Sequence, residues 1–307
     1  MLFFGHQLII DMKKILLALA IIGASQIANA QQLHFMSQYL QHNSMFNPAA
    51  AGMSERSFVG VTNRSMWSDF PGNPKTTMVY ADFILDNLNS GISTYLYKDQ
   101  TGPTSRTGAQ VAYSYQIPTF QEGILSFGLE LRGIQYSLDK SKITDALNGS
   151  GETDPVLGGS NNKFVFDAGA GVYWNVNNYT VGLAVSQLMS SKLSLADVPN
   201  STLSGKLYRH YNLTGSYKIK TGEDIYVIPN FMYRIVENAP SDFDMGVKVD
   251  YLNKLWFVVN KRVHQFVSLQ TGVKIKQKYS VCYAYDYYKN PIGGNGAHEI
   301  GLQYDIN

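Results

Sequence analysis

From residue 57 to the C-terminus, apolar and polar residues alternate one for one in about fourteen stretches, and almost none has the spacing of an amphipathic helix. In one such stretch the apolar residues Phe243, Met245, Val247, Val249 and Tyr251 share one parity, and the residues between them are charged or glycine. Side chains of an extended strand point alternately to opposite sides. Each stretch therefore predicts a β-strand with one apolar and one polar face.

The connections between these stretches distinguish two all-β folds, a soluble sandwich and a membrane barrel. The predicted strands lie near 57–66, 75–84, 90–99, 105–117, 123–138, 163–175, 177–188, 208–220, 223–236, 240–251, 254–261, 264–275, 277–288 and 295–307. Links after even-numbered strands are short, whereas the links after the first, third, fifth, seventh and thirteenth strands include all the long ones, notably 139–162 and 189–207. Outer-membrane barrels have short periplasmic turns and long external loops, and a soluble sandwich has no reason to sort its loops in this way. We expect a single antiparallel transmembrane β-barrel of about 14 strands, between 12 and 14.

The first thirty residues support export. Lys13 and Lys14 precede an apolar run at 15–22, and the small-residue triplet 28–30 follows, which is the layout of a secretory signal peptide. The apolar run is too short for a spanning helix. We therefore expect a signal peptide at 1–30 with a true start possible at Met12, an N-terminal segment at 31–56 and the barrel at 57–307.

The register predicts which faces meet lipid and which meet the lumen. Leu129 and Leu131 are expected to face lipid, with Glu130 and Arg132 in the lumen, because Arg or Lys on the lipid face at the bilayer centre costs roughly 2–4 kcal/mol. Both positively and negatively charged residues fall on the side of the strands that faces the lumen, and we predict that they form internal ion pairs, some across the lumen. These lumen-facing charged residues are Arg64, Asp82, Glu130, Arg132, Lys248, Lys274 and Asp286.

Composition excludes some functions. Without residues 1–30 the chain has 23 basic and 22 acidic residues, a net charge of about +1. There is no Lys/Arg run, which argues against a nucleic-acid partner. Cys282 is the only cysteine, so an intrachain disulfide and a cysteine-based zinc site are excluded, and we expect a small buried packing residue.

No motif indicates catalysis. The chain has no nucleophile elbow, no zinc-protease motif and no phosphate loop. The acidic stretch 145–154 does not fit a calcium loop, because Leu147 and Gly149 stand where oxygen ligands are required. His298 and Glu299 are neighbours on a strand and point to opposite faces, so they cannot form an acid/base pair. We expect no enzyme activity, no cofactor and no metal.

Residues 31–56 are the one part that does not alternate. They are apolar and nearly uncharged, and Asn47 and Pro48 predict a turn. A barrel of this size has room for a plug. The segment is expected either inside or across the periplasmic mouth, or as an arm on the periplasmic surface. Beyond it, Trp67, Pro71, Gly72 and Pro74 suit a rigid external turn, and a direct contact with cargo there is the lesser alternative.

Several short motifs occur in a characteristic order. They are FMSQYLQHNSMFNPAAAG at 35–52, NRSMWSDFPGNPKT at 63–76, DQTGP at 99–103, AGAGVYW at 168–174, VGLAVSQL at 181–188, AYDY at 284–287 and HEIGLQYDI at 298–306. In this order the chain resembles the PorP/SprF family of type IX secretion system outer-membrane proteins. The resemblance implies an outer-membrane barrel needed for gliding motility or for type IX export, with partners among the secretion components and a secreted or surface-anchored cargo protein. It implies no catalytic residues.

Together these observations predict an integral outer-membrane barrel, surrounded by lipid, that docks a cargo or a translocon subunit on its long external loops. A passive channel for small solutes is the alternative. The residues singled out as candidates for function are Asn47, Pro48, Arg64, Trp67, Gly72, Pro74, Asp286, His298 and Glu299.

Overall fold

The computed structural model describes residues 36–120, 122–139, 142, 160–193, 205–263, 265–288 and 296–306. These belong to one compact unit that spans residues 32–307. The predicted signal peptide and the acidic stretch 145–154 lie outside the described residues, as do most of the two long links.

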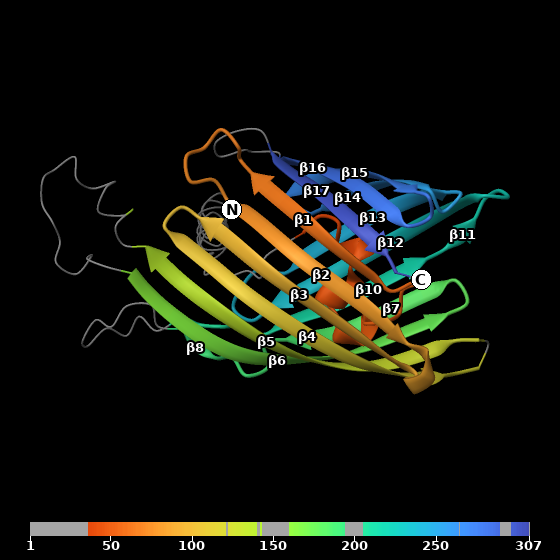
Figure 1. Cartoon of the computed structure of the whole chain (residues 1–307), viewed down its shortest axis with the longest axis horizontal. Helices are drawn as coiled ribbons and strands as arrows, with labels where there is room; N and C mark the ends of the chain where they lie inside the picture. The colour runs from red at the N-terminus through yellow and green to blue at the C-terminus, as the bar shows by residue number, and fades with distance from the viewer. Residues whose placement is uncertain are drawn as a thin grey trace, which may run out of the picture. The chain divides into compact units, whose positions relative to one another are not determined.

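Fourteen antiparallel strands close into a barrel (Figure 1). The first strand pairs with the last, β7 pairs with β10 across the gap that the small hairpin β8–β9 leaves in the numbering, and β10 pairs with β12. The barrel strands are β1 (Phe58–Met66), β2 (Lys75–Leu85), β3 (Ser90–Thr101), β4 (Thr104–Pro118), β5 (Ile124–Asp139), β6 (Ser160–Val176), β7 (Tyr179–Ser186), β10 (His210–Tyr217), β12 (Ile225–Val236), β13 (Asp242–Tyr251), β14 (Leu255–Arg262), β15 (Phe266–Ile275), β16 (Tyr279–Tyr288) and β17 (Ala297–Asp305). The short β11 (Ile219–Lys220) extends the β10 edge, and the hairpin consists of β8 (Lys192–Leu193) and β9 (Gly205–Lys206). The expected fold is confirmed.

The two rims of the barrel differ. Phe58 pairs with Asp305, so β1 begins and β17 ends at the same rim, which we call the chain-end rim. The connections at this rim are short, and the longest links, between β5 and β6 and between β7 and β10, lie at the opposite, long-link rim. The long-link rim also carries a tight turn at Thr101–Thr104, so the third link is not one of the long ones. Gly102, with a φ of +54°, and Pro103 make this compact connection possible.

The outer surface of the barrel is apolar. Leu129 and Leu131 are 68% and 72% exposed, whereas Glu130 and Arg132 between and beside them are only 2% exposed. Aromatic residues gather near the chain-end rim on seven strands: Tyr115, Trp174, Tyr179, Tyr217, Tyr251, Tyr279 and Tyr304. An apolar band bordered by an aromatic girdle is typical of barrels embedded in a bilayer. No helix within the described ranges has the length and apolar character needed to cross a membrane.

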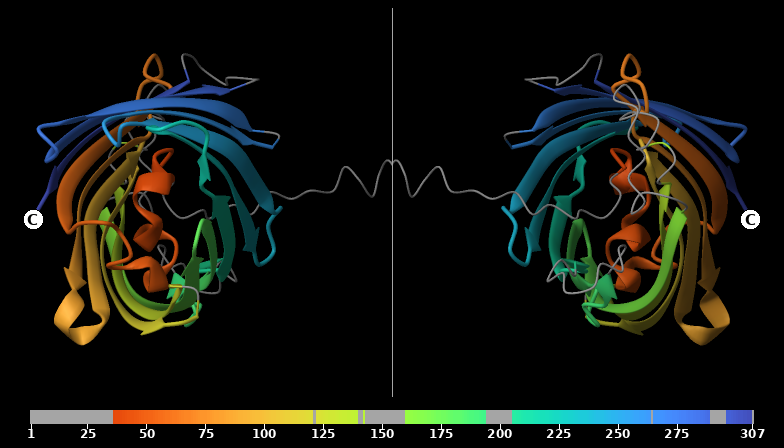
Figure 2. Two further views of the ribbon diagram at one scale, coloured as in Figure 1. Left: turned by 90° about the vertical axis from the view of Figure 1, so that its right-hand side faces the viewer. Right: turned by 90° about the vertical axis from the view of Figure 1, so that its left-hand side faces the viewer.

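Residues 36–52, which we call the lumenal segment, lie inside the ring of strands (Figure 2). The segment contains three single-turn 3₁₀ helices, η1 (Tyr39–Gln41), η2 (Asn43–Met45) and η3 (Pro48–Ala50); a fourth, η4 (Asp86–Leu88), lies between β2 and β3. Its apolar side chains pack on aromatic and methionine side chains of the inner wall, and this cluster comprises Met36, Tyr39, Met45, Phe46, Phe58, Met78, Tyr80, Tyr95, Tyr97 and Met232. The segment therefore occupies the lumen and does not lie along the outer surface.

Candidate functional site in the barrel lumen

The turn predicted at Asn47 and Pro48 begins η3 and is seated against the wall. The Asn47 side chain accepts a hydrogen bond from the Ala49 amide at 3.0 Å, and Pro48 occupies the first helical position. The Asn47 side-chain amide also donates to the Val172 carbonyl at 3.0 Å. This asparagine joins the lumenal segment to β6.

Two lumenal glycines make room for this seat. A Cβ atom at Gly128 on β5 would lie 2.2 Å from the Ala49 nitrogen, and one at Gly171 on β6 would lie 2.1 Å from Asn47 Oδ1. Any larger side chain at these positions displaces the segment or the strand. The inner wall is thus shaped to the lumenal segment.

At its N-terminal end the segment is held by an ionic cluster. Arg64 on β1 binds Asp286 on β16 at 2.5 Å and Glu299 on β17 at 3.2 Å. The Ser37 amide donates to Glu299 at 2.7 Å, and the Ser37 hydroxyl donates to Asp286 at 2.6 Å. The three charged residues are 2% exposed or less. Three of the predicted candidate residues therefore meet at one place, which we call the Arg64 cluster.

The sequence did not indicate the partners that the segment contributes. Ser37 and Gln38 are uncharged residues in a stretch without alternation, so the sequence does not distinguish them from their neighbours. Their contacts with the barrel wall are visible only in the structure. Gln38 accepts a hydrogen bond from the Cys282 thiol at 2.6 Å, and Gln270 donates to the Ser37 carbonyl at 2.7 Å. Cys282 is buried, as expected.

The described ion pairs run along the wall rather than across the lumen, which corrects one expectation. Arg132 binds Glu130 on its own strand at 2.9 Å, and Asp244 binds Arg234 and Arg262 on the two strands beside it at 2.9 and 2.7 Å. The lumenal segment fills the centre of the barrel, so charges on facing walls are separated. In each of these pairs the cationic side chain meets its partner on the same or an adjacent strand.

Towards the chain-end rim the lumenal segment is held by further hydrogen bonds and a ring contact. The Gly52 amide donates to Asp82 at 2.8 Å, and the Ser114 hydroxyl donates to the Ala51 carbonyl at 2.7 Å. His42 is 3% exposed, and its ring centre lies 3.9 Å from that of Tyr80. Burial lowers the pKa of His42 to about 3, so this imidazole is neutral in the folded protein.

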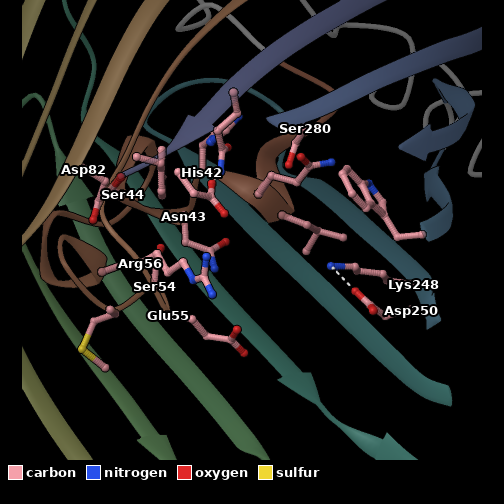
Figure 3. A pocket seen from close by; sticks show the side chains of 18 of the residues that line it. His42, Asn43, Ser44, Ser54, Glu55, Arg56, Asp82, Lys248, Asp250 and Ser280 are labelled. Atoms are coloured by element: carbon pink, nitrogen blue, oxygen red, sulfur yellow. Dashed lines mark hydrogen bonds and ion pairs between the residues drawn. The ribbon is translucent and has the colours of Figure 1, made fainter. Parts of the chain in front are cut away.

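A cavity of about 410 Å³ lies between the lumenal segment and the wall at the chain-end rim. Figure 3 shows Glu55 and Arg56 on one side of it and the Lys248–Asp250 pair on the other. No group of three or more His, Cys, Asp or Glu side chains suited to a metal ion is found among the residues that the structure describes.

The remaining candidate residues lie away from the lumen. Trp67, Gly72 and Pro74 belong to the β1–β2 link at the long-link rim, where the Trp67 amide donates to the Gly296 carbonyl at 2.8 Å and the Gly102 amide donates to the Gly72 carbonyl at 2.8 Å. His298 points outward and bonds the Tyr283 hydroxyl at 2.7 Å, while Glu299 points inward. The two neighbours act separately, as their strand position predicts.

A closed antiparallel barrel with an apolar, aromatic-girdled exterior and a polar interior defines an outer-membrane β-barrel. Over residues 28–304 the sequence matches the family model described as type IX secretion system membrane protein PorP/SprF. The chain therefore belongs to the PorP/SprF family, and the resemblance drawn from its motifs is confirmed. No curated protein sequence matches the chain.

Two solved structures show the same barrel architecture. The toluene transporter TbuX of Ralstonia pickettii has a TM-score of 0.55 and 11% identity, over 86% of this chain and 93% of that one. The monoaromatic hydrocarbon channel CymD has a TM-score of 0.51 and 12% identity, over 90% of this chain and 94% of that one. At these identities the likeness concerns the fold alone.

Proposed function

We propose that this barrel is a non-enzymatic anchor of the type IX secretion system that docks a secreted or surface-attached protein at the outer membrane. The observation that supports this proposal best is the filled lumen. The lumenal segment is bound to the wall by buried hydrogen bonds at both ends, at Ser37 and at Gly52. A barrel filled in this way is suited to hold a partner rather than to pass solutes.

The two long links provide the docking surface in this proposal. They leave the same rim, opposite the chain-end rim, and on the outer-membrane rule they face the exterior. The described base of the second link is fixed, because Leu207 is 2% exposed and packs on Ile134 and Val165. A docking loop on a rigid base loses less conformational entropy on binding than a loop whose base is also mobile.

A passive channel for small solutes is the alternative. The cavity at the chain-end rim favours a channel, since it is an open space inside the lumen that small molecules can enter. The Arg64 cluster and the seat of η3 oppose it, because at both places the segment is in direct contact with the wall.

Affinity purification from native outer membranes tests the docking proposal. The tag is placed in the exposed turn at Gly222–Asp224, on the rim away from the long links. We expect the intact protein to bring down type IX components and a secreted protein, and replacement of residues 143–157 by a short Gly-Ser linker to lose the secreted protein. A matched Gly-Ser replacement of Asn253 and Lys254, in a chain-end turn, should retain it. A barrel that purifies without either class of partner, or a cargo that stays bound to the linker variant, would overturn docking by this link.

A further inference from the structure

The cavity at the chain-end rim, which we call the vestibule, has features of a ligand site. Its volume of about 410 Å³ falls in the usual range of small-molecule pockets, roughly 300–1,000 Å³. One side is formed by residues 40–56 and most of the other by strands from β12 to β17. Phe58 of β1, Asp82 of β2, Lys218, and Tyr173 and Asn175 of β6 complete the wall. The proposed docking surface lies at the opposite rim and does not include the vestibule.

The charges that line the vestibule are balanced. Four cationic side chains, Arg56, Lys218, Lys248 and Lys274, meet four carboxylates, Glu55, Asp82, Asp250 and Asp305. Two pairs are already formed, Lys248 with Asp250 at 3.2 Å and Lys274 with Asp305 at 2.8 Å. The lining thus has no excess of either sign, which favours a neutral ligand.

The neutral groups of the lining are mostly ones that both donate and accept hydrogen bonds. Five side-chain amides line the vestibule, namely Gln41, Asn43, Asn175, Asn253 and Gln303, together with the hydroxyls of Ser44, Ser54 and Ser280. The vestibule therefore offers both donors and acceptors to a neutral ligand.

We propose that the vestibule binds a neutral, hydroxyl-rich ligand of the size of a mono- or disaccharide. A hydroxyl group donates and accepts at a single atom, so a hydroxyl-rich ligand can donate to the lining carboxylates and pair with the serine hydroxyls. The side-chain amides along the wall then pair with the remaining hydroxyls. A peptide has neutral backbone amides as well, but its N–H and C=O groups are separate atoms in fixed alternation and match this mixed lining less well.

Fluorescence titration of the full chain in detergent micelles tests the proposal. Trp67→Phe and Trp174→Phe leave Trp256 as the only tryptophan, and cellobiose and acetyl-trialanine amide are the probes. We expect saturable binding of cellobiose and none of the peptide. Asp250→Asn should weaken cellobiose binding about tenfold, because it removes a charged hydrogen-bond acceptor.

Two further variants keep the result interpretable. Asn175→Ala removes a lining amide that forms no described ion pair, and it should weaken binding even if Asp250→Asn disturbs the barrel. Glu223→Gln, in an exposed turn at the same rim and outside the vestibule, should leave binding unchanged. The proposal is overturned if cellobiose does not bind, if the peptide binds in its place, or if binding is insensitive to both lining variants. Docking on the long links would stand in any of these cases.

Discussion

Reversal of the charge at Arg64 is expected to destabilise the barrel strongly. Arg64 is 2% exposed and lies between Asp286 at 2.5 Å and Glu299 at 3.2 Å. Removal of one partner from a buried ion pair costs about 3–5 kcal/mol, because the other charge stays buried and unpaired. Arg64→Glu leaves two unpaired carboxylates and adds a third, so we expect a loss of at least about 4 kcal/mol, a large part of the stability of an ordinary domain.

Urea unfolding in detergent micelles, followed by tryptophan fluorescence, measures this loss. A change of this size should lower the unfolding midpoint by more than about 1 M. Lys254→Glu makes the same charge change in an exposed turn and should alter the stability by less than about 0.5 kcal/mol. Arg64→Glu combined with Asp286→Arg restores one opposite-charge contact and should recover part of the loss. A midpoint for Arg64→Glu equal to that of Lys254→Glu would refute the role of the Arg64 cluster.

Two further outcomes follow from the seating of the lumenal segment. Gly128→Val places a side chain where a Cβ would already lie 2.2 Å from the Ala49 nitrogen, so it should displace the segment and expose Cys282. Maleimide labelling of Cys282 should then accelerate at least about tenfold. The control Gly222→Val, where the nearest atom is 3.9 Å from the added Cβ, should leave labelling slow. Equal labelling rates in the two variants would contradict the packing of the lumenal segment against Gly128. Burial lowers the pKa of His42 to about 3, so below its ordinary value near 6.5 the unfolded chain binds a proton that the folded protein does not. The free energy of unfolding should therefore fall as the pH drops from about 6.5 towards 3, by up to about 1.4 kcal/mol per pH unit. In urea unfolding measured at several pH values, His42→Phe should remove this contribution to the slope. An unchanged slope would count against a buried neutral imidazole.

The barrel itself follows from the sequence because a strand has a period of two. Parity assigns Leu129 and Leu131 to the lipid and Glu130 and Arg132 to the lumen without knowledge of the neighbouring strands, and the exposures agree. Links are also local features, so their lengths sorted the two rims. The link at Thr101–Thr104 is shorter than the sequence predicts, because β3 extends beyond residue 99 and β4 begins before residue 105.

The lumenal site depends on contacts between distant positions, and a single sequence does not pair them. Ser37 and Glu299 are 262 positions apart, and the residues around each give no indication that the two are in contact. Arg64, Asp286 and Glu299 were recognisable as inward-facing charges, but their convergence depends on the closure of β1 on β17. Gly128 and Gly171 carry no signal that distinguishes a seat for another segment from an ordinary small residue. The Asn47–Pro48 turn was predictable because capping chemistry is local.

Single-channel conductance in planar bilayers tests the central claim most directly. A barrel filled by its lumenal segment should insert without a steady open conductance, and deletion of residues 33–50 should produce a stable open channel, since a barrel of this strand number has a lumen wider than its own side chains fill. A wild-type protein that conducts steadily, with no rise after the deletion, would contradict the filled lumen and favour the passive channel.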